Sequence, residues 1–161
     1  MRPLQPEYNN LRLIEGTAAT PDVRALLSHH FEVMRAHSPL SSCHVMEPEE
    51  LIDARATLLT ARELGELLGV GAIREIGPGH AELKSMHTSA AARGRGVGQT
   101  ILTGLLDHAR NRNWKRVSLE TGTIDLFAPA RALYQRNGFS ECPPFGDYVT
   151  DPLSVFMTRT L

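Results

Sequence analysis

The stretch Arg93-Gly94-Arg95-Gly96-Val97-Gly98 carries the strongest indication of the fold. Three glycines within five residues allow the backbone to turn sharply and to direct several N–H groups toward one point. The apolar residues that follow recur at the spacing of an amphipathic helix: Val97, Ile101, Leu102, Leu105, Leu106 and Ala109. The loop therefore precedes the positive end of a helix dipole, and this arrangement predicts a phosphate-binding site.

The residues around the glycines restrict which phosphate ligand fits. A Walker loop would end in Gly-Lys-Ser/Thr, which this loop lacks, and the dinucleotide pattern GxGxxG fails because Gln99 occupies its third glycine position. Nucleoside triphosphates and NAD are therefore disfavoured. Arg93 and Arg95 add positive charge beside the loop. A glycine-rich turn with two solvated arginines is the alternative interpretation.

Upstream of the loop, hydrophobic periodicity predicts a strand, two helices and a series of antiparallel strands. The helices are introduced by proline and acidic residues, as is typical of a first helical turn. The predicted elements are a strand at 11–14, a helix from Thr20-Pro21-Asp22 to Met34, a shorter helix from Pro48, a hairpin with arms at 56–60 and 66–76 joined by a turn at 61–65, and a strand at 81–88.

Downstream, the order strand, helix, strand implies a right-handed parallel crossover. The predicted elements are a helix at 97–109, a strand at 117–121, a helix at 128–136 that ends at Asn137-Gly138, and a last strand at 154–160. The expected fold class is α+β, with a mixed, mostly antiparallel central sheet flanked by helices, and we expect residues 1–161 to form one domain.

Composition excludes several classes of protein. The chain has 161 residues, of which 42% are hydrophobic and 22% charged, as in globular proteins and unlike disordered ones. Its 17 Lys and Arg against 18 Asp and Glu give a net charge of −1, which favours neither nucleic acid nor a membrane surface. Without an apolar N-terminal run or a membrane-spanning segment, we expect a cytoplasmic protein. Seven histidines and two cysteines show no metal-ligand spacing, so no metal is expected.

The loop and two neighbouring segments resemble one known family. Arg-x-x-Gly-x-Gly at 93–98 is similar to the Gln/Arg-x-x-Gly-x-Gly/Ala signature of the GNAT superfamily of N-acetyltransferases. Met86-His87-Thr88 resembles the bulged fourth strand of that family, and residues 132–139 resemble its Leu-Tyr-x-x-x-Gly-Phe segment. Phe127 departs from the pattern, because the family often has asparagine seven positions before its tyrosine.

The resemblance implies a GNAT-like acyl-CoA N-acyltransferase fold with acetyl-CoA as co-substrate. In the family, the loop cradles the pyrophosphate and the bulged strand pairs with the pantetheine arm. The residues expected to bind acetyl-CoA on this basis are Met86, His87, Thr88, Arg93, Gly94, Arg95, Gly96, Val97, Gly98 and Gln99.

Transfer of an acetyl group to an amine requires a base for the amine and an acid for the thiol. The resemblance makes Tyr134 the donor to the CoA thiolate, and makes backbone N–H groups near Met86 the groups that polarise the thioester. It also implies that Glu82, eleven residues before Arg93, is the base, as in the histone acetyltransferase branch. Glu120 on the next strand is the rival, and we favour Glu82. A solvated charge at a strand end is the alternative interpretation of both carboxylates.

Strand periodicity adds an expectation about which side chains share a face. Alternation places Glu82, Lys84, Met86 and Thr88 on one face of the strand, unless a bulge intervenes. His87, a further candidate base, would then lie on the opposite face.

Acceptor recognition is expected from residues 31–47 and 143–151. The segment 143–148 is aromatic and acidic, which suits a small cationic amine, although a rigid connecting loop is an equal alternative. We predict direct transfer to a primary amine of a small molecule or peptide in a ternary complex, because Cys43 and Cys142 have no evident histidine partner. A homodimer is compatible with the resemblance. The alternative functions are a non-catalytic acyl-CoA-binding regulatory module and a nucleotide-phosphate binder.

Overall fold

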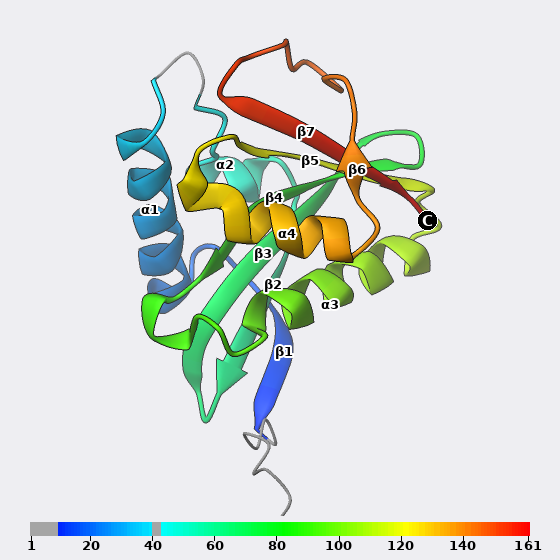
Figure 1. Ribbon diagram of the computed structural model, residues 1–161. Helices are drawn as coiled ribbons and strands as arrows, with labels where there is room; N and C mark the ends of the chain where they lie inside the picture. The colour runs from blue at the N-terminus through cyan, green and yellow to red at the C-terminus, as the bar shows by residue number, and fades with distance from the viewer. Residues whose placement is uncertain (1–9, 40–42) are drawn as a thin grey trace, which may run out of the picture.

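A seven-stranded sheet in the order β1-β2-β3-β4-β5-β7-β6 forms the centre of the part of the chain that the structure describes (Figure 1). The computed structural model describes residues 10–39 and 43–161. The N-terminal residues 1–9, which were expected to carry no targeting segment, and residues 40–42 of the expected acceptor segment lie outside the described residues. The strands are β1 (Leu11–Gly16), β2 (Thr57–Glu63), β3 (Glu66–Gly77), β4 (His80–Thr88), β5 (Arg116–Gly122), β6 (Ser140–Glu141) and β7 (Ser154–Thr160).

Helices cover both faces of this sheet. They are α1 (Pro21–Ala36), α2 (Pro48–Asp53), α3 (Val97–Asn111) and α4 (Ala128–Arg136), with short 3-10 turns η2 (Ala90–Ala92) and η3 (Asp125–Phe127). In Figure 1, α3 and α4 cross the face of the sheet that is turned toward the viewer. Ile101 and Leu105 of α3 pack into the core on that face, whereas Val23 and Leu27 of α1 pack against Val70 on the opposite face.

The sheet is mostly antiparallel, with one parallel pair. Strands β1 to β4 pair with their neighbours in antiparallel fashion, and β5 pairs antiparallel with β7. Between β4 and β5, joined by α3, the pairing is parallel. The predicted fold class, the parallel pairing of the strands on either side of α3 and the order of the elements are therefore confirmed.

The hairpin between β2 and β3 is tighter than predicted. Strand β2 continues to Glu63, which pairs with Glu66, so the loop contains Leu64 and Gly65 instead of residues 61–65. Both loop residues have positive φ, +50° and +84°, as a type I′ turn requires. The hairpin was predicted, but its two-residue loop was not, because Leu64 is not a residue that favours the left-handed region.

Helix α3 lies against bare backbone of β3. A Cβ atom added at Gly71 would lie 2.5 Å from Met86 Sδ and 2.6 Å from Ile101 Cγ2, and one at Gly69 would lie 2.9 Å from Val97 Cγ1. Real Cβ atoms do not approach other atoms so closely. The two glycines therefore allow the start of α3 to approach the sheet, and this approach sets where the loop before α3 lies.

Two further properties of the described residues concern membrane-spanning helices and metal sites. None of the helices in the described ranges combines the length and the apolar character that a membrane span requires. Within the same ranges, no three or more His, Cys, Asp or Glu side chains converge in a way that could hold a metal ion.

The strained turn generates a stability prediction. Leu64 is 85% exposed and has φ of +50°, so its side chain contributes little packing while its backbone is strained. We expect Leu64→Asn to increase the free energy of unfolding by about 0.5–1 kcal/mol, because asparagine tolerates this conformation. Urea unfolding measures the change. Leu64→Ala, which removes the same side chain without relieving the strain, is the control, and equal stability of the two variants would contradict the explanation.

Candidate active site

Strands β4 and β5 separate after a short parallel contact. They pair only at His80–Arg116, Ala81–Val117 and Glu82–Ser118, after which each continues without the other. A cleft opens between them, and we call it the strand cleft. It is lined by His30, Met34, His44, Lys84, Ser85, Met86, Leu119, Glu120, Thr121, Phe127, Ala130 and Tyr134, among others.

A second cavity, which we call the loop groove, runs from this cleft toward the glycine-rich loop. Its lining includes Met86, His87, Thr88, Arg93, Gly94, Gly96, Val97, Gly98, Leu133 and Tyr134. The two cavities share five lining residues, which are Met34, Met86, Phe127, Ala130 and Tyr134. The cavities therefore meet at these residues, so a molecule in the loop groove and a molecule in the strand cleft would contact each other there.

A bulge in β4 shapes the boundary between the cavities. Lys84 pairs with Ala72 of β3, but His87 pairs with Val70, so β4 contains an extra residue relative to its partner. Ser85 has φ of +54°, which places the distortion at this residue. The bulge was expected from the family resemblance, and the structure confirms it.

The bulge reverses the alternation of side chains that follow it. Met86 packs against the core beneath α3, on the face opposite to Glu82 and Lys84. His87 instead reaches His30 of α1, and its ring lies on the α1 face. The alternation that put Met86 on the face of Glu82 and His87 on the other face was stated for a strand without a bulge. The bulge is present, and its one inserted residue exchanges the faces of Met86 and His87.

The glycine-rich loop presents backbone donors. Gly96 caps α3 with φ of +77°, and its carbonyl oxygen accepts a 3.1 Å hydrogen bond from the N–H of Thr100. The N–H groups of the first turn after this cap have no partner within the helix, and they form the positive end of its dipole. The arrangement fits an anion such as a pyrophosphate.

Two of the residues expected at the acetyl-CoA site direct their side chains elsewhere. Arg95 forms an ion pair with Glu63 of β2. The side-chain amides of Gln99 and Asn137 exchange two hydrogen bonds of 2.8 Å, which tie α3 to the end of α4. Neither Arg95 nor Gln99 is among the residues that line the loop groove. Their contribution to a ligand is therefore limited to backbone groups, and Arg93 is the arginine that faces the groove.

Tyr134 lies where the two cavities meet. Its ring packs edge-on against Phe139, with centroids 5.9 Å apart, and the residue is 6% exposed. Burial, followed by the nearby charge of Glu120, raises the pKa of the Tyr134 hydroxyl above its ordinary value of 10.0. The hydroxyl therefore keeps its proton at neutral pH and is available as a donor.

Glu120 lines the strand cleft on β5. Burial raises the pKa of its carboxyl from 4.5 to about 7, while Ser154 and the charge of Lys84 act in the opposite direction. A carboxyl with this pKa is about half ionised at neutral pH, which suits a group that accepts and releases a proton.

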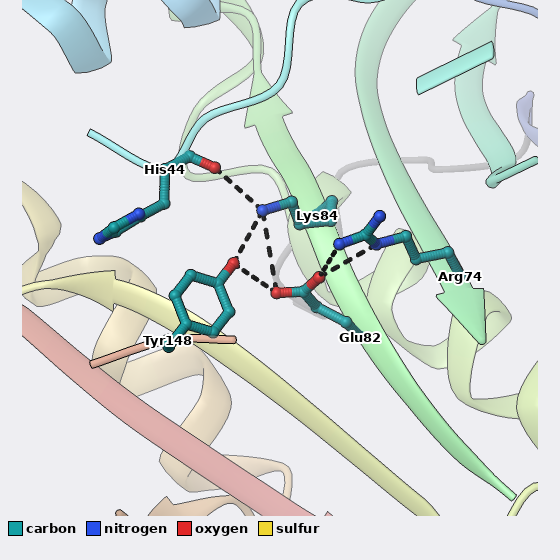
Figure 2. A network of polar contacts seen from close by, with 5 residues as sticks. All are labelled: His44, Arg74, Glu82, Lys84 and Tyr148. Carbon is teal, nitrogen blue, oxygen red and sulfur yellow. Dashed lines mark hydrogen bonds and ion pairs between the residues drawn. The ribbon is translucent and has the colours of Figure 1, made fainter. Parts of the chain in front are cut away.

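Glu82 is held in a buried polar network (Figure 2). It is 1% exposed, and its Oε1 accepts hydrogen bonds of 3.1 and 3.0 Å from Nε and Nη2 of Arg74. Its Oε2 accepts a 2.5 Å hydrogen bond from the hydroxyl of Tyr148. Both carboxylate oxygens thus have partners, and Glu82 is not among the residues that line either cavity.

A histidine pair connects the two cavities. The Nδ1 atoms of His30 in α1 and His87 in β4 lie 2.9 Å apart, so one ring donates to the other. Burial, and then the charge of the neighbouring histidines, lowers the pKa of His30 to about 3 and that of His87 to about 4. Both rings are therefore neutral at physiological pH.

Several residues of the site were not predicted from the sequence as functional candidates. They are His30 and Lys84, together with Arg74, which pairs with Glu82. His44 and Tyr148 lie in the segments 31–47 and 143–151 that were expected to recognise the acceptor, but they were not singled out within them. Alternation along β4 had already placed Lys84 on the face of Glu82, so the sequence contained a signal that could have identified Lys84 as a candidate. His44 and Tyr148 belong to irregular segments, whose approach to β4 no local pattern indicates.

Comparison with known proteins agrees with this geometry. Residues 20–139 match the model of the Acetyltransferase (GNAT) family. The N-acetyltransferase YsnE of Bacillus subtilis is 42% identical over 139 residues, which cover 86% of this chain and 92% of that protein. YedL of Escherichia coli, also named an N-acetyltransferase, is 39% identical and is matched over 88% of this chain and 89% of its own length.

Solved structures share the fold. An acyl-CoA N-acyltransferase structure from Klebsiella pneumoniae superposes with a TM-score of 0.77 at 30% identity, covering 94% of this chain and 97% of that one. A GNAT family acetyltransferase from Elizabethkingia anophelis, solved with acetyl-CoA bound, gives a TM-score of 0.70 at 18% identity, covering 95% and 99% of the two chains. The chain belongs to the GNAT family of acetyltransferases. It is an acetyl-CoA-dependent N-acetyltransferase.

The geometry of the loop generates a binding prediction. We expect Gly96→Ala to weaken acetyl-CoA binding by about tenfold, because a Cβ strains the backbone at φ of +77° and shifts the N–H groups that follow. Isothermal titration with acetyl-CoA measures the effect. Gly79→Ala imposes similar strain at φ of +67° in the turn before β4, outside both cavities, and serves as the control. Equal affinity in the two variants would contradict the role of the loop.

Proposed function

We propose that this enzyme transfers the acetyl group of acetyl-CoA directly to a primary amine of a small molecule or peptide, in a ternary complex. The observation that carries the proposal is the junction of two cavities at Tyr134, with Glu120 on the wall of the strand cleft. Two substrates that enter from different sides can meet at this junction, and no covalent acyl-enzyme is then required.

The residues of the loop groove fit acetyl-CoA. The N–H groups at the start of α3 would hold the pyrophosphate, with Arg93 adding charge from the side of the groove. Met86, His87 and Thr88 would flank the pantetheine arm, at the edge of β4 that β5 leaves after Glu82. Bound acetyl-CoA supplies a thioester whose acetyl group is activated for attack by an amine.

Backbone at the bulge supports the transfer. Ser85 and Met86 have no partner in the register with β3, and both line the strand cleft. An N–H group at this position would stabilise the negative charge that develops on the thioester oxygen. The bulge thereby gives a strand backbone a role that a regular strand, with its N–H groups paired, does not have.

Of the two candidate carboxylates, we propose Glu120 as the base. It lines the cleft, and its pKa of about 7 keeps an ionised fraction that can accept a proton from an ammonium group. Glu82 is better explained as the anion of a structural network, because Arg74 and Tyr148 occupy its oxygens. The earlier preference for Glu82 is thus reversed in this proposal.

For the departing thiolate, we propose Tyr134 as the proton donor. Its buried hydroxyl keeps its proton, it faces both cavities, and it lies near enough to Glu120 for that charge to affect its pKa. Base and acid thus stand on neighbouring elements, β5 and α4, at the junction where the thioester would lie.

Initial-rate kinetics test the proposed route. With acetyl-CoA and a panel of primary amines, direct transfer gives intersecting double-reciprocal lines, whereas parallel lines would indicate a covalent acyl-enzyme and contradict the proposal. Binding of acetyl-CoA without thiol release for any amine would instead support a regulatory module.

The role of Glu120 predicts a change in pH dependence. Below pH 7 the carboxyl is protonated and cannot accept a proton, so kcat/KM of the wild-type enzyme should fall as the pH decreases through about 7. Glu120→Gln should lower kcat/KM by about 10²–10⁴-fold and remove this limb of the profile. Glu82→Gln is the comparison, because it should lower the free energy of unfolding yet retain the limb. Loss of the limb in Glu82→Gln alone would assign the base to Glu82.

The same titration should affect stability. The folded carboxyl has a pKa of about 7 and an ordinary value of 4.5, so the folded state binds the proton more tightly. Stability therefore decreases as the pH rises from about 4.5 to about 7, and Glu120→Gln should remove this decrease. At pH 8 the variant should be more stable than the wild type while less active, a combination that general damage to the fold cannot produce.

The role of Tyr134 predicts a selective loss of rate. Tyr134→Phe keeps the ring against Phe139 and should leave the acetyl-CoA dissociation constant unchanged, while kcat falls by about 10²–10⁴-fold. Steady-state kinetics and titration with acetyl-CoA separate the two quantities. Full kcat in the variant would transfer the leaving-group role to water.

A further inference from the structure

A buried ammonium group lies in the wall of the strand cleft. The side chain of Lys84 is 10% exposed, and Lys84 lines the cleft next to the bulge. Among the described residues of this lining, it is the only lysine or arginine. Burial of an ammonium group is costly unless partners compensate for the lost hydration, so the partners of Lys84 indicate what its charge does.

Two of its three N–H groups have acceptors. The Nζ atom donates hydrogen bonds of 2.9 Å to the carbonyl oxygen of His44 and to the hydroxyl oxygen of Tyr148. Tyr148 uses its own proton toward Glu82, so it can only accept from Lys84 (Figure 2). The Oε2 atom of Glu82 is 3.8 Å from Nζ, beyond hydrogen-bond distance. The third N–H therefore has no hydrogen-bond acceptor among the residues that the structure describes.

The nearest carboxylate is already balanced by another cation. Arg74 donates two hydrogen bonds to Oε1 of Glu82 and neutralises its charge. Arg74 and Lys84 thus share one buried anion, and Glu120 and Glu50 attract Lys84 without a hydrogen bond. Burial outweighs these attractions, and it lowers the pKa of Lys84 below its ordinary value of 10.5. The cluster of Arg74, Glu82 and Lys84 carries an excess positive charge on the side of the cleft.

We infer that the acceptor amine carries a carboxylate, and that Lys84 binds this carboxylate in the strand cleft. The inference rests on the proposed function and adds the chemical class of the acceptor. Glu120, on the opposite strand of the same cleft, would accept the proton of the ammonium end. An amino acid satisfies both residues at once, because it has one end for each, whereas an amine without a carboxylate leaves the N–H of Lys84 buried and unpaired.

Lys84 is held in position for this role. The Tyr148 ring lies 5.6 Å from Nζ, and His44 packs edge-on against that ring with centroids 5.1 Å apart. The Tyr148 ring and the His44 segment therefore restrict the movement of the ammonium group before a ligand binds. Less conformational entropy of the Lys84 side chain is then lost on binding. We regard Lys84 as a residue that determines acceptor specificity.

Matched pairs of acceptors test the inference. Glycine, β-alanine and leucine are compared with glycinamide, β-alaninamide and leucinamide, which keep the amine and the chain but lack the negative charge. The carboxylate raises the pKa of its own amine, so the amides contain more neutral amine at a given pH, and this bias opposes the expected result. For the wild-type enzyme we expect kcat/KM to be higher for the acids by about ten- to a hundredfold.

Two lysine variants assign the preference. Lys84→Gln should reduce the ratio of acid to amide to about one. Lys115→Gln removes the same charge at an exposed position directly before β5, and should keep the wild-type ratio. Acetyl-CoA affinity and thermal unfolding of both variants show whether each is folded. If Lys84→Gln does not fold, inhibition of the wild-type enzyme by N-acetylglycine against N-acetylglycinamide replaces the variant, with stronger inhibition by the acid expected.

The outcomes separate the two proposals. Amides that react as well as or better than the acids, across all three pairs, overturn the inference and leave the proposed function intact. An acid preference that survives in folded Lys84→Gln also overturns it. Absence of acetylation of every amine in both sets, by an enzyme that binds acetyl-CoA, overturns the proposed function itself.

Discussion

The separation of β4 from β5 is the constraint on which the rest of the structure depends. Two parallel strands that pair over three residues and then part leave backbone without a sheet partner in the middle of the molecule. A bound ligand can occupy this space, and residues of both strands line the strand cleft that opens there. Glu120 and Lys84 lie along that opening on the two strands, and Tyr134 lies on the helix α4 that borders it.

Two carboxylates near this opening, Glu82 and Glu120, have different surroundings. Glu82 lies deep, where Arg74 and Tyr148 donate hydrogen bonds to its two oxygens. Glu120 lies at the cleft with a pKa of about 7 and is free to change its charge. Two residues of the same type on paired strands thus differ in behaviour because one has a guanidinium partner and the other has a cavity. Glu82 in turn accepts a hydrogen bond from Tyr148, whose hydroxyl oxygen accepts one from Lys84.

Much of the fold follows from local sequence signals. The apolar repeat of α3 between two strand patterns predicts the parallel crossover, and the resemblance to the GNAT family predicts the bulge. The faces of Met86 and His87 did not follow, because a single inserted residue at Ser85 reverses alternation and its position is fixed by pairing with β3. Tyr148 and His44 lie in the two segments expected to recognise the acceptor, but their contacts with Lys84 could not be predicted, since these contacts span 64 and 40 residues along the chain.

The contact of α3 with bare backbone has a consequence for how such an enzyme can diverge. At Gly69 and Gly71 no side chain separates the helix from the sheet. Side chains can change rotamer when their surroundings change, but peptide planes in a paired strand cannot. The distance between α3 and the sheet is therefore fixed by backbone, and this distance also fixes the position of the loop that precedes α3. Residues around the strand cleft can therefore be replaced to accommodate a new acceptor, while the loop groove, where acetyl-CoA would bind, keeps its position.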